Sequence, residues 1–129
     1  MKDYIDATTD QTRGEKAHIS IEQALGKLSS AAATTGSRSV MLFEHGTLQV
    51  KMYSPDDHDP QQPHSYDEIY VVARGEGIFF DGVARHNFRT GDLIFAPAGS
   101  VHRFENFTDD FSVWVMFYGP EGGEQPIQS

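Results

Sequence analysis

The 129-residue chain contains no cysteine, one tryptophan, and only ten lysines and arginines against nineteen aspartates and glutamates. Without cysteine, neither a disulfide framework nor a thiolate metal site can form, so any metal must be held by nitrogen and oxygen ligands. The formal net charge of −9 disfavours nucleic acid as a partner, because that binding needs clustered positive charge. The expected partner is a small neutral or weakly charged substrate or ligand.

Long apolar runs are also missing. The longest run extends from Val113 to Tyr118, far short of the roughly 20 residues that a membrane span needs. The N-terminus carries acids and threonines where a secretory signal would need an apolar stretch. We therefore expect no membrane association and a cytoplasmic protein, and the length predicts a single domain.

The first part of the chain carries one helical signal. Residues up to about Lys16 are polar and lack periodicity, which predicts a loose arm with no assigned function, although in an oligomer such arms sometimes pair with a neighbour's sheet edge. Ser20 and Gln23 have the spacing of a capping box, and the apolar positions after them predict a short amphipathic helix from Ile21 to about Ser30. Residues 31–37 read as a linker. The expected organisation is an N-terminal arm and helix in 1–37, one β-domain in 38–119, and a C-terminal tail in 120–129.

From Val40 onward the periodicity is that of β-strands. Short segments rich in β-forming residues recur at even spacing between turn signals, and no second helix is long enough for βαβ units. The predicted strands are Val40–Glu44, Leu48–Tyr53, Glu68–Arg74, Ile78–Phe80, Leu93–Ala96, Val101–Asn106 and Ser112–Tyr118. This pattern predicts an all-β sandwich or barrel of about eight strands. The last strand is apolar on both faces, so another layer or a second subunit should cover one of them.

Two stretches of the strand region carry side chains that can bind a metal. His64 and Glu68 are four residues apart, so with Tyr66 they would share one face of an extended strand. His102 opens a later strand, directly after a tight turn with Pro97. Taken alone, the His64 and Glu68 spacing favours a hydrogen-bonded pair that binds nothing, because such spacings are common by accident.

The later stretch matches in spacing the second signature motif of the cupin superfamily, G-x5-P-x-G-x2-H-x3-N, at Gly91, Pro97, Gly99, His102 and Asn106. The first cupin motif, G-x5-H-x-H-x3,4-E-x6-G, is met in its second half by His64, Glu68 and Gly75. Its opening differs, because Asp56 and Gln62 stand where the motif has glycine and histidine. From about Val40 to Gly119 the chain resembles a small single-domain cupin.

The resemblance implies a double-stranded β-helix, the jelly-roll barrel, holding a divalent transition metal on His64, Glu68 and His102. Two imidazoles and one carboxylate on one side of an ion form the triad of non-haem Fe(II) oxygenases, so Fe(II) is favoured, with Zn, Mn or Ni also suited. Gln62 could be a weak fourth ligand, could bond a metal-bound water, or could point outward. Tyr66 or Tyr70 would position or protonate the substrate.

Several functions are compatible with that resemblance. Dioxygenase-type chemistry on a small oxygen-rich molecule is the first expectation. Isomerase, epimerase or lyase chemistry on a sugar or keto acid is the second, since function cannot be read from fold. A non-catalytic cupin that binds a small ligand is the third. The doubly apolar last strand, and what small cupins usually do, predict a homodimer.

The remaining charged and histidine side chains are expected at the surface. Asp56, Asp57, His58 and Asp59 lack the spacing of a calcium loop and predict a solvated loop. The histidines at positions 18, 45 and 86 have no ligand spacing beside them. Arg74 and Arg85 could recognise a carboxylate, but solvated charges are the better interpretation.

Overall fold

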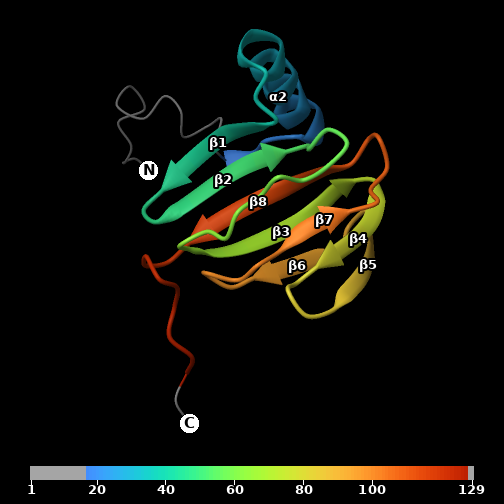
Figure 1. Cartoon of the computed structure of the whole chain (residues 1–129). Helices are drawn as coiled ribbons and strands as arrows, with labels where there is room; N and C mark the ends of the chain where they lie inside the picture. Colours follow the sequence, from blue (N-terminus) through green and yellow to red (C-terminus); the bar gives the residue numbers. More distant parts are fainter. Residues whose placement is uncertain (1–16, 128–129) are drawn as a thin grey trace, which may run out of the picture.

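The computed structural model describes residues 17–127, which form two antiparallel sheets with one helix against the larger sheet (Figure 1). The larger sheet has five strands in the order β1-β2-β8-β3-β6, and the smaller has three in the order β5-β4-β7. The elements are α2 (Ile21–Thr35), β1 (Ser39–His45), β2 (Leu48–Tyr53), β3 (Asp67–Arg74), β4 (Glu76–Phe80), β5 (Arg85–Arg89), β6 (Leu93–Ala96), β7 (Arg103–Glu105) and β8 (Ser112–Tyr118). The predicted all-β jelly-roll with a short N-terminal helix is confirmed. The predicted N-terminal arm lies outside the described residues.

Helix α2 begins as predicted and ends later than predicted. The Ser20 hydroxyl accepts the backbone N–H of Gln23, and the Gln23 side chain accepts that of Ser20, so the capping box is confirmed. The helix continues through residues 31–35 because alanine is the strongest helix former. It ends at Gly36, whose left-handed backbone, with φ of 77°, suits glycine. The prediction that residues 31–35 form a linker was therefore wrong.

The two apolar faces of β8 are buried in different places. Val113 and Val115 lie in the cluster between the sheets. Trp114 and Met116 pack instead against a second cluster that includes Leu28 of α2 and residues of β1 and β2. The layer predicted to cover the last strand thus includes the helix of the same chain.

The chain crosses from the larger sheet to the smaller one at Gly75, between β3 and β4. Gly75 has a φ of 91°, and a Cβ atom there would lie 2.6 Å from Thr108 Oγ1 and 2.8 Å from the Cα atom of Phe111. No other residue fits this position without displacing the neighbouring loop. The crossing lets β3 and β7, which belong to different sheets, face each other across the interior.

Strand β5 was not predicted from the sequence. Its residues are Arg-His-Asn-Phe-Arg, and of these only Phe88 is buried, so the apolar alternation that marks a strand is absent. It pairs with β4 along its whole length. Strand β7 is shorter than the predicted Val101–Asn106, which leaves His102 just outside it.

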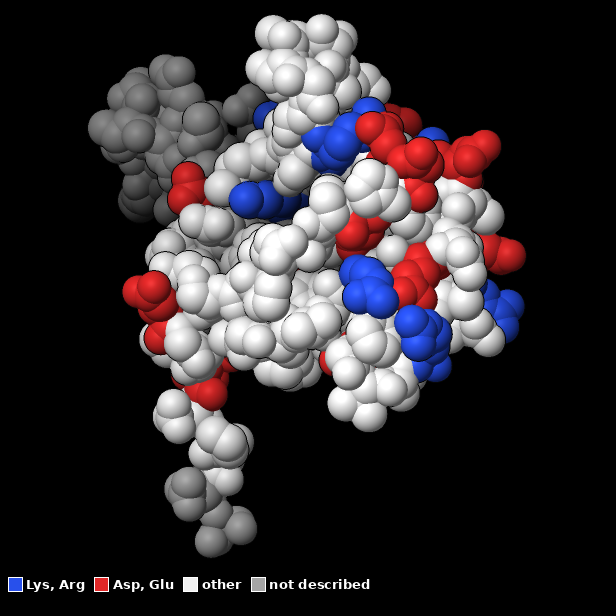
Figure 2. Space-filling view, viewed as in Figure 1, with Lys and Arg blue, Asp and Glu red and all other residues white. Residues whose placement is uncertain are grey.

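One face of the molecule carries mixed charge. On the face shown in Figure 2, lysines and arginines lie among aspartates and glutamates and do not form one continuous basic surface. Within residues 17–127, no helix has the length and apolarity to cross a membrane.

Candidate metal centre

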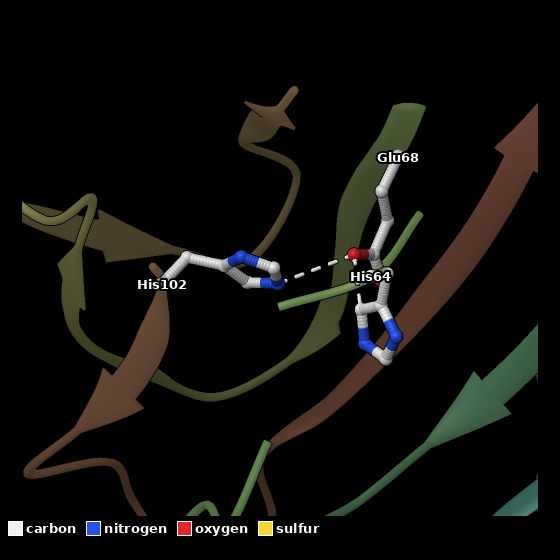
Figure 3. Close-up of side chains that lie close together, drawn as sticks. All are labelled: His64, Glu68 and His102. Atoms are coloured by element: carbon white, nitrogen blue, oxygen red, sulfur yellow. Dashed lines mark ion pairs between the residues drawn. The ribbon is translucent and has the colours of Figure 1, made fainter. Parts of the chain in front are cut away.

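Three predicted ligands come together between the two sheets (Figure 3). Glu68 is the second residue of β3, in the five-stranded sheet, and His64 lies in the segment that leads into this strand. His102 immediately precedes β7, in the three-stranded sheet. The ring of His102 points across the interior toward the Glu68 carboxylate, with the ring of His64 beside it. Residues 38 positions apart in the sequence thus face one space.

The distances suit a common ion. Glu68 Oε1 lies 3.2 Å from His102 Nε2 and 4.0 Å from His64 Nε2, and one donor atom from each residue lies within 4.8 Å of the others. Donors bound to one ion at about 2.1 Å are separated by about 3 to 3.4 Å in octahedral or tetrahedral geometry. The Glu68–His102 distance already lies in this range, and the ring of His64 has to move closer for all three to bind one ion.

The burial of the Glu68 carboxylate is the strongest indication of a cation-binding site. Glu68 is 1% exposed, and neither of its oxygens nor His102 Nε2 has a hydrogen-bond partner within residues 17–127. The 3.2 Å approach between the two side chains does not give a hydrogen bond of good geometry. Buried polar groups in proteins are almost always paired, and a bare carboxylate is costly to bury. A cation would satisfy all three atoms at once, so the residues fit a metal.

The orientation of His102 leaves the correct nitrogen free. Its Nδ1 lies 3.0 Å from the carbonyl oxygen of Ser100, which can only accept, so Nδ1 donates and Nε2 keeps its lone pair toward Glu68. Burial lowers the pKa of His102, but the Glu68 carboxylate and the Ser100 carbonyl outweigh it and raise this pKa above its usual value. The neighbourhood of His102 is thus set up to stabilise positive charge.

Backbone contacts join the two motifs. The N–H of Gly99 donates to the carbonyl of His64 over 2.7 Å, and the N–H of Ala98 donates to the buried Asp67 carboxylate over 2.9 Å. The ring of His64 also packs edge-on against Phe117 of β8, with 5.0 Å between ring centroids. These contacts fix the turn before His102 against the segment that carries His64.

Two predicted site residues lie away from the cluster. Tyr66 is 41% exposed, and Gln62 is exposed as well. The prediction that His64, Tyr66 and Glu68 share a strand face was wrong, because β3 begins only at Asp67 and alternation does not extend into the preceding turn. Tyr70, by contrast, is fully buried in line with Glu68.

The structure brings Gln61 to the cluster in place of its neighbour Gln62. The Gln61 side-chain oxygen lies 3.3 Å from His64 Nε2 and accepts the Tyr70 hydroxyl at 3.0 Å. Its amide nitrogen donates to Asp59 over 2.8 Å. Sequence reasoning missed Gln61, because no motif spacing marks it.

The prediction that Asp59 lies in a solvated loop was wrong. Asp56, Asp57 and His58 are exposed as predicted, but Asp59 is 7% exposed. Its carboxylate accepts the Tyr53 hydroxyl and the backbone N–H of Phe104, which lies 45 residues further along the chain. Asp59 thus attaches the loop to β7, two residues beyond His102.

The surface predictions for the remaining residues hold. His18, His45 and His86 are exposed, and His86 pairs with Asp81 at 2.8 Å. Arg85 pairs with Glu105 at 2.8 Å and stacks over Phe80, while Arg74 lies 3.8 Å from Glu22. Both arginines thus make contacts at the surface.

Two of the candidate ligands adjoin open space. The side chain of His64 is 36% exposed, so solvent reaches this ring. A cavity of about 240 Å³ has His102 in its wall, together with Phe79, Phe95, Pro97 and Ser100. This space can admit a small molecule next to one of the three candidate ligands.

The cupin domain family model (Cupin_2) matches residues 49–118, and the chain therefore belongs to the cupin family. An uncharacterized protein of Streptomyces coelicolor, SCO3923, is 28% identical over 99 residues, which cover 75% of this chain and 94% of that protein.

Solved structures share the fold. KdgF from Halomonas sp. superposes with a TM-score of 0.56 at 17% identity, covering 62% of this chain and 77% of KdgF. The DMSP lyase DddQ from Ruegeria pomeroyi gives a TM-score of 0.56 at 23% identity, covering 67% of this chain and 50% of DddQ. A cupin 2 conserved barrel domain protein from Salinispora arenicola gives a TM-score of 0.53 at 22% identity, covering 63% of this chain and 74% of that protein. Identities this low establish the fold and leave the reaction open.

Proposed function

We propose that this protein is a metal-dependent cupin enzyme that acts on a small oxygen-rich molecule, with dioxygenase-type chemistry, and that His64, Glu68 and His102 hold the ion. The observation that carries the proposal is that three buried atoms, both Glu68 oxygens and His102 Nε2, have no hydrogen-bond partner within the described part of the chain. A group that binds a cation explains their burial, whereas a structural ion pair would be expected to make a hydrogen bond.

The donor set favours Fe(II). Two histidines and one carboxylate on one side of an ion leave the other side open, as in non-haem Fe(II) oxygenases. When bound, the ion would supply Lewis-acid or redox chemistry to an oxygen-bearing ligand. The cavity beside His102 has mostly apolar walls, from Phe79, Phe95 and Pro97, which limits water around a bound substrate.

Tyr70 is the residue of this chain best placed to hold a proton near the cluster. Burial raises the pKa of Tyr70 well above its usual value, and the negative charge of Glu68 raises it further. The hydroxyl therefore stays protonated and acts as a donor, at present to Gln61. In the proposed enzyme it donates a hydrogen bond or a proton to an oxygen of the substrate.

The protonated Tyr70 also favours a second candidate, a lyase or isomerase that consumes no dioxygen. Such reactions need a proton donor more than a redox metal. The DMSP lyase DddQ shares this fold, which is an analogy and not evidence for the substrate.

Metal replacement separates the two candidates. The chain would be stripped of metal, loaded with Fe(II) or with redox-inactive Zn(II), and incubated with catechols, diketones, keto acids and sugars. Dioxygen uptake by the Fe(II)-loaded protein, but not by the Zn(II)-loaded protein, supports the oxygenase. Turnover that is equal with Zn(II) and unaffected by removing dioxygen supports the second candidate. Tight metal and ligand binding without turnover would overturn both and leave a binding protein. Glu68→Gln is the control that should abolish metal loading.

A further inference from the structure

We propose that Gln61, and not Gln62, is the fourth protein donor to the cation, and that Asp59 is the positioning residue that directs its amide oxygen to the site. This inference rests on the proposed metal centre of His64, Glu68 and His102. It assigns a role to two residues whose place in the sequence gives no indication of one.

The orientation of the Gln61 amide follows from the chemistry of its neighbours. The Asp59 carboxylate can only accept hydrogen bonds, so the Gln61 group 2.8 Å from Asp59 Oδ2 must be the NH₂. The amide oxygen is then on the opposite side, where it accepts the Tyr70 hydroxyl and lies 3.3 Å from His64 Nε2. Asp59 thus excludes the flipped amide, which would turn two donors toward Tyr70 and His64.

Asp59 is itself held from several directions. Its two oxygens accept the Tyr53 hydroxyl, the backbone N–H of Phe104 and both the side-chain and backbone N–H groups of Gln61. With 7% exposure and four donors, this carboxylate has little freedom to rotate. A rigid acceptor holds the Gln61 amide in one orientation.

The Gln61 oxygen has a second lone pair available beside His64. A carbonyl oxygen can accept two hydrogen bonds, and Tyr70 uses one. The second can accept a hydrogen bond from His64 Nε2 only while that nitrogen carries a hydrogen. A histidine that binds a cation through Nε2 carries no proton there, so the second lone pair is then free to bind the same ion. Its 3.3 Å separation from His64 Nε2 is close to the 3.2 Å between Glu68 and His102, as expected for neighbouring donors around one ion.

Gln62 offers no comparable contact. Its side chain is exposed, and within the described residues it makes no side-chain hydrogen bond that would direct its amide. It occupies the place where the cupin motif has a histidine, yet the chain turns its neighbour toward the cluster. Gln62→Ala is therefore a matched control for Gln61→Ala.

The test measures binding of Co(II) and Zn(II) to the full chain by competition with a chelator, together with the visible spectrum of the Co(II) form. Gln61→Ala should weaken binding about 10- to 100-fold and change the Co(II) spectrum, because one oxygen donor is lost. Gln62→Ala should change neither. Gln61→Met keeps the side-chain length without the oxygen and should behave like Gln61→Ala, and thermal melts establish that each variant is folded.

Asp59 is tested by a double-mutant cycle. As a single substitution, Asp59→Asn should weaken metal binding. Asparagine can also donate a hydrogen bond, which allows the Gln61 amide to flip. Asp59→Asn should add nothing in Gln61→Ala, because the two residues act through one oxygen. Additive losses would overturn the role of Asp59. Wild-type affinity in both Gln61 variants, or an equal loss in Gln62→Ala, would overturn the role of Gln61 while leaving the three-residue centre intact. A wild-type chain that binds no metal would instead overturn the proposed function.

Discussion

Glu68 Oε1 lies 3.2 Å from Nε2 of His102, yet neither atom makes a hydrogen bond within the part of the chain that the structure describes. A carboxylate and an imidazole this close and this deeply buried usually share a well-aligned hydrogen bond. The arrangement fits a set of metal ligands better than a structural ion pair. The two interpretations predict opposite effects of neutralising Glu68.

If Glu68 is a ligand, Glu68→Gln should cost no stability in the metal-free protein and should raise the free energy of unfolding by about 1 kcal/mol. The variant removes a buried carboxylate that lacks hydrogen-bond partners within residues 17–127, and a neutral His102 leaves no charge behind. Denaturant unfolding of the stripped proteins measures the difference. A loss of 3 kcal/mol or more, as expected when one partner of a true buried ion pair is removed, would contradict this account.

The crossing between the sheets predicts a strict requirement for glycine at position 75. Gly75→Ala should destabilise the fold by roughly 3 kcal/mol or more, because its Cβ would meet Thr108 and the backbone of Phe111 and its φ is positive. Gly91 is the control, since it has a similar φ of 94° and nothing within 4 Å of a Cβ atom. Gly91→Ala should cost only the backbone strain, about 1–2 kcal/mol. Equal losses in the two melts would show that the crossing is not tightly packed.

Asp67 anchors the turn before His102 to the C-terminal segment. Its two oxygens accept the backbone N–H groups of Ala98 and Glu124, at 2.9 and 2.7 Å, and the residue is 5% exposed. Asp67→Ala removes both acceptors and should cost about 3 kcal/mol in unfolding free energy. Asp67→Asn keeps one carbonyl oxygen and should cost about half as much. If both variants unfold like the wild type, the turn is held by other contacts.

Alkaline pH should destabilise the protein through two tyrosines. Burial raises the pKa of Tyr70 and of Tyr53, with Glu68 adding to the first effect and Asp59 to the second. Both hydroxyls stay protonated in the folded state, while in the unfolded chain they ionise near a pKa of about 10. Their contribution to stability is therefore complete below about pH 10 and is lost as pH rises above it, by up to about 1.4 kcal/mol per pH unit for each tyrosine. Tyr70→Phe should reduce this slope in denaturant unfolding, and an unchanged slope would show that Tyr70 ionises freely in the folded protein.

The sequence predicted best where burial imposes a period. The bounds of β2, β6 and β8 agree with the predicted segments because each of these strands alternates or is continuously apolar. Strand β5 was not predicted, because four of its five residues are exposed and polar. It is a strand because β4 offers it hydrogen bonds, a tertiary effect that local pattern does not contain.

Some residues of the site were likewise predicted from the sequence and others were not. The spacing of the two cupin motifs predicted His64, Glu68 and His102, because these motifs mark residues that converge in space. Asp59 and Gln61 were not, because their positions depend on contacts such as the bond from Asp59 to the Phe104 N–H across 45 residues. An aspartate in an acidic, proline-bearing loop has the sequence pattern of a solvated residue, and only the packed structure shows its burial.

The central claim is that one cation binds between His64, Glu68 and His102. Elemental analysis of protein purified without chelators measures this directly, beside His102→Ala purified in the same way. We expect close to one transition-metal ion per wild-type chain and the loss of most of it in the variant. A wild-type chain that contains no metal and takes up none of Fe(II), Mn(II), Ni(II) or Zn(II) would contradict the account.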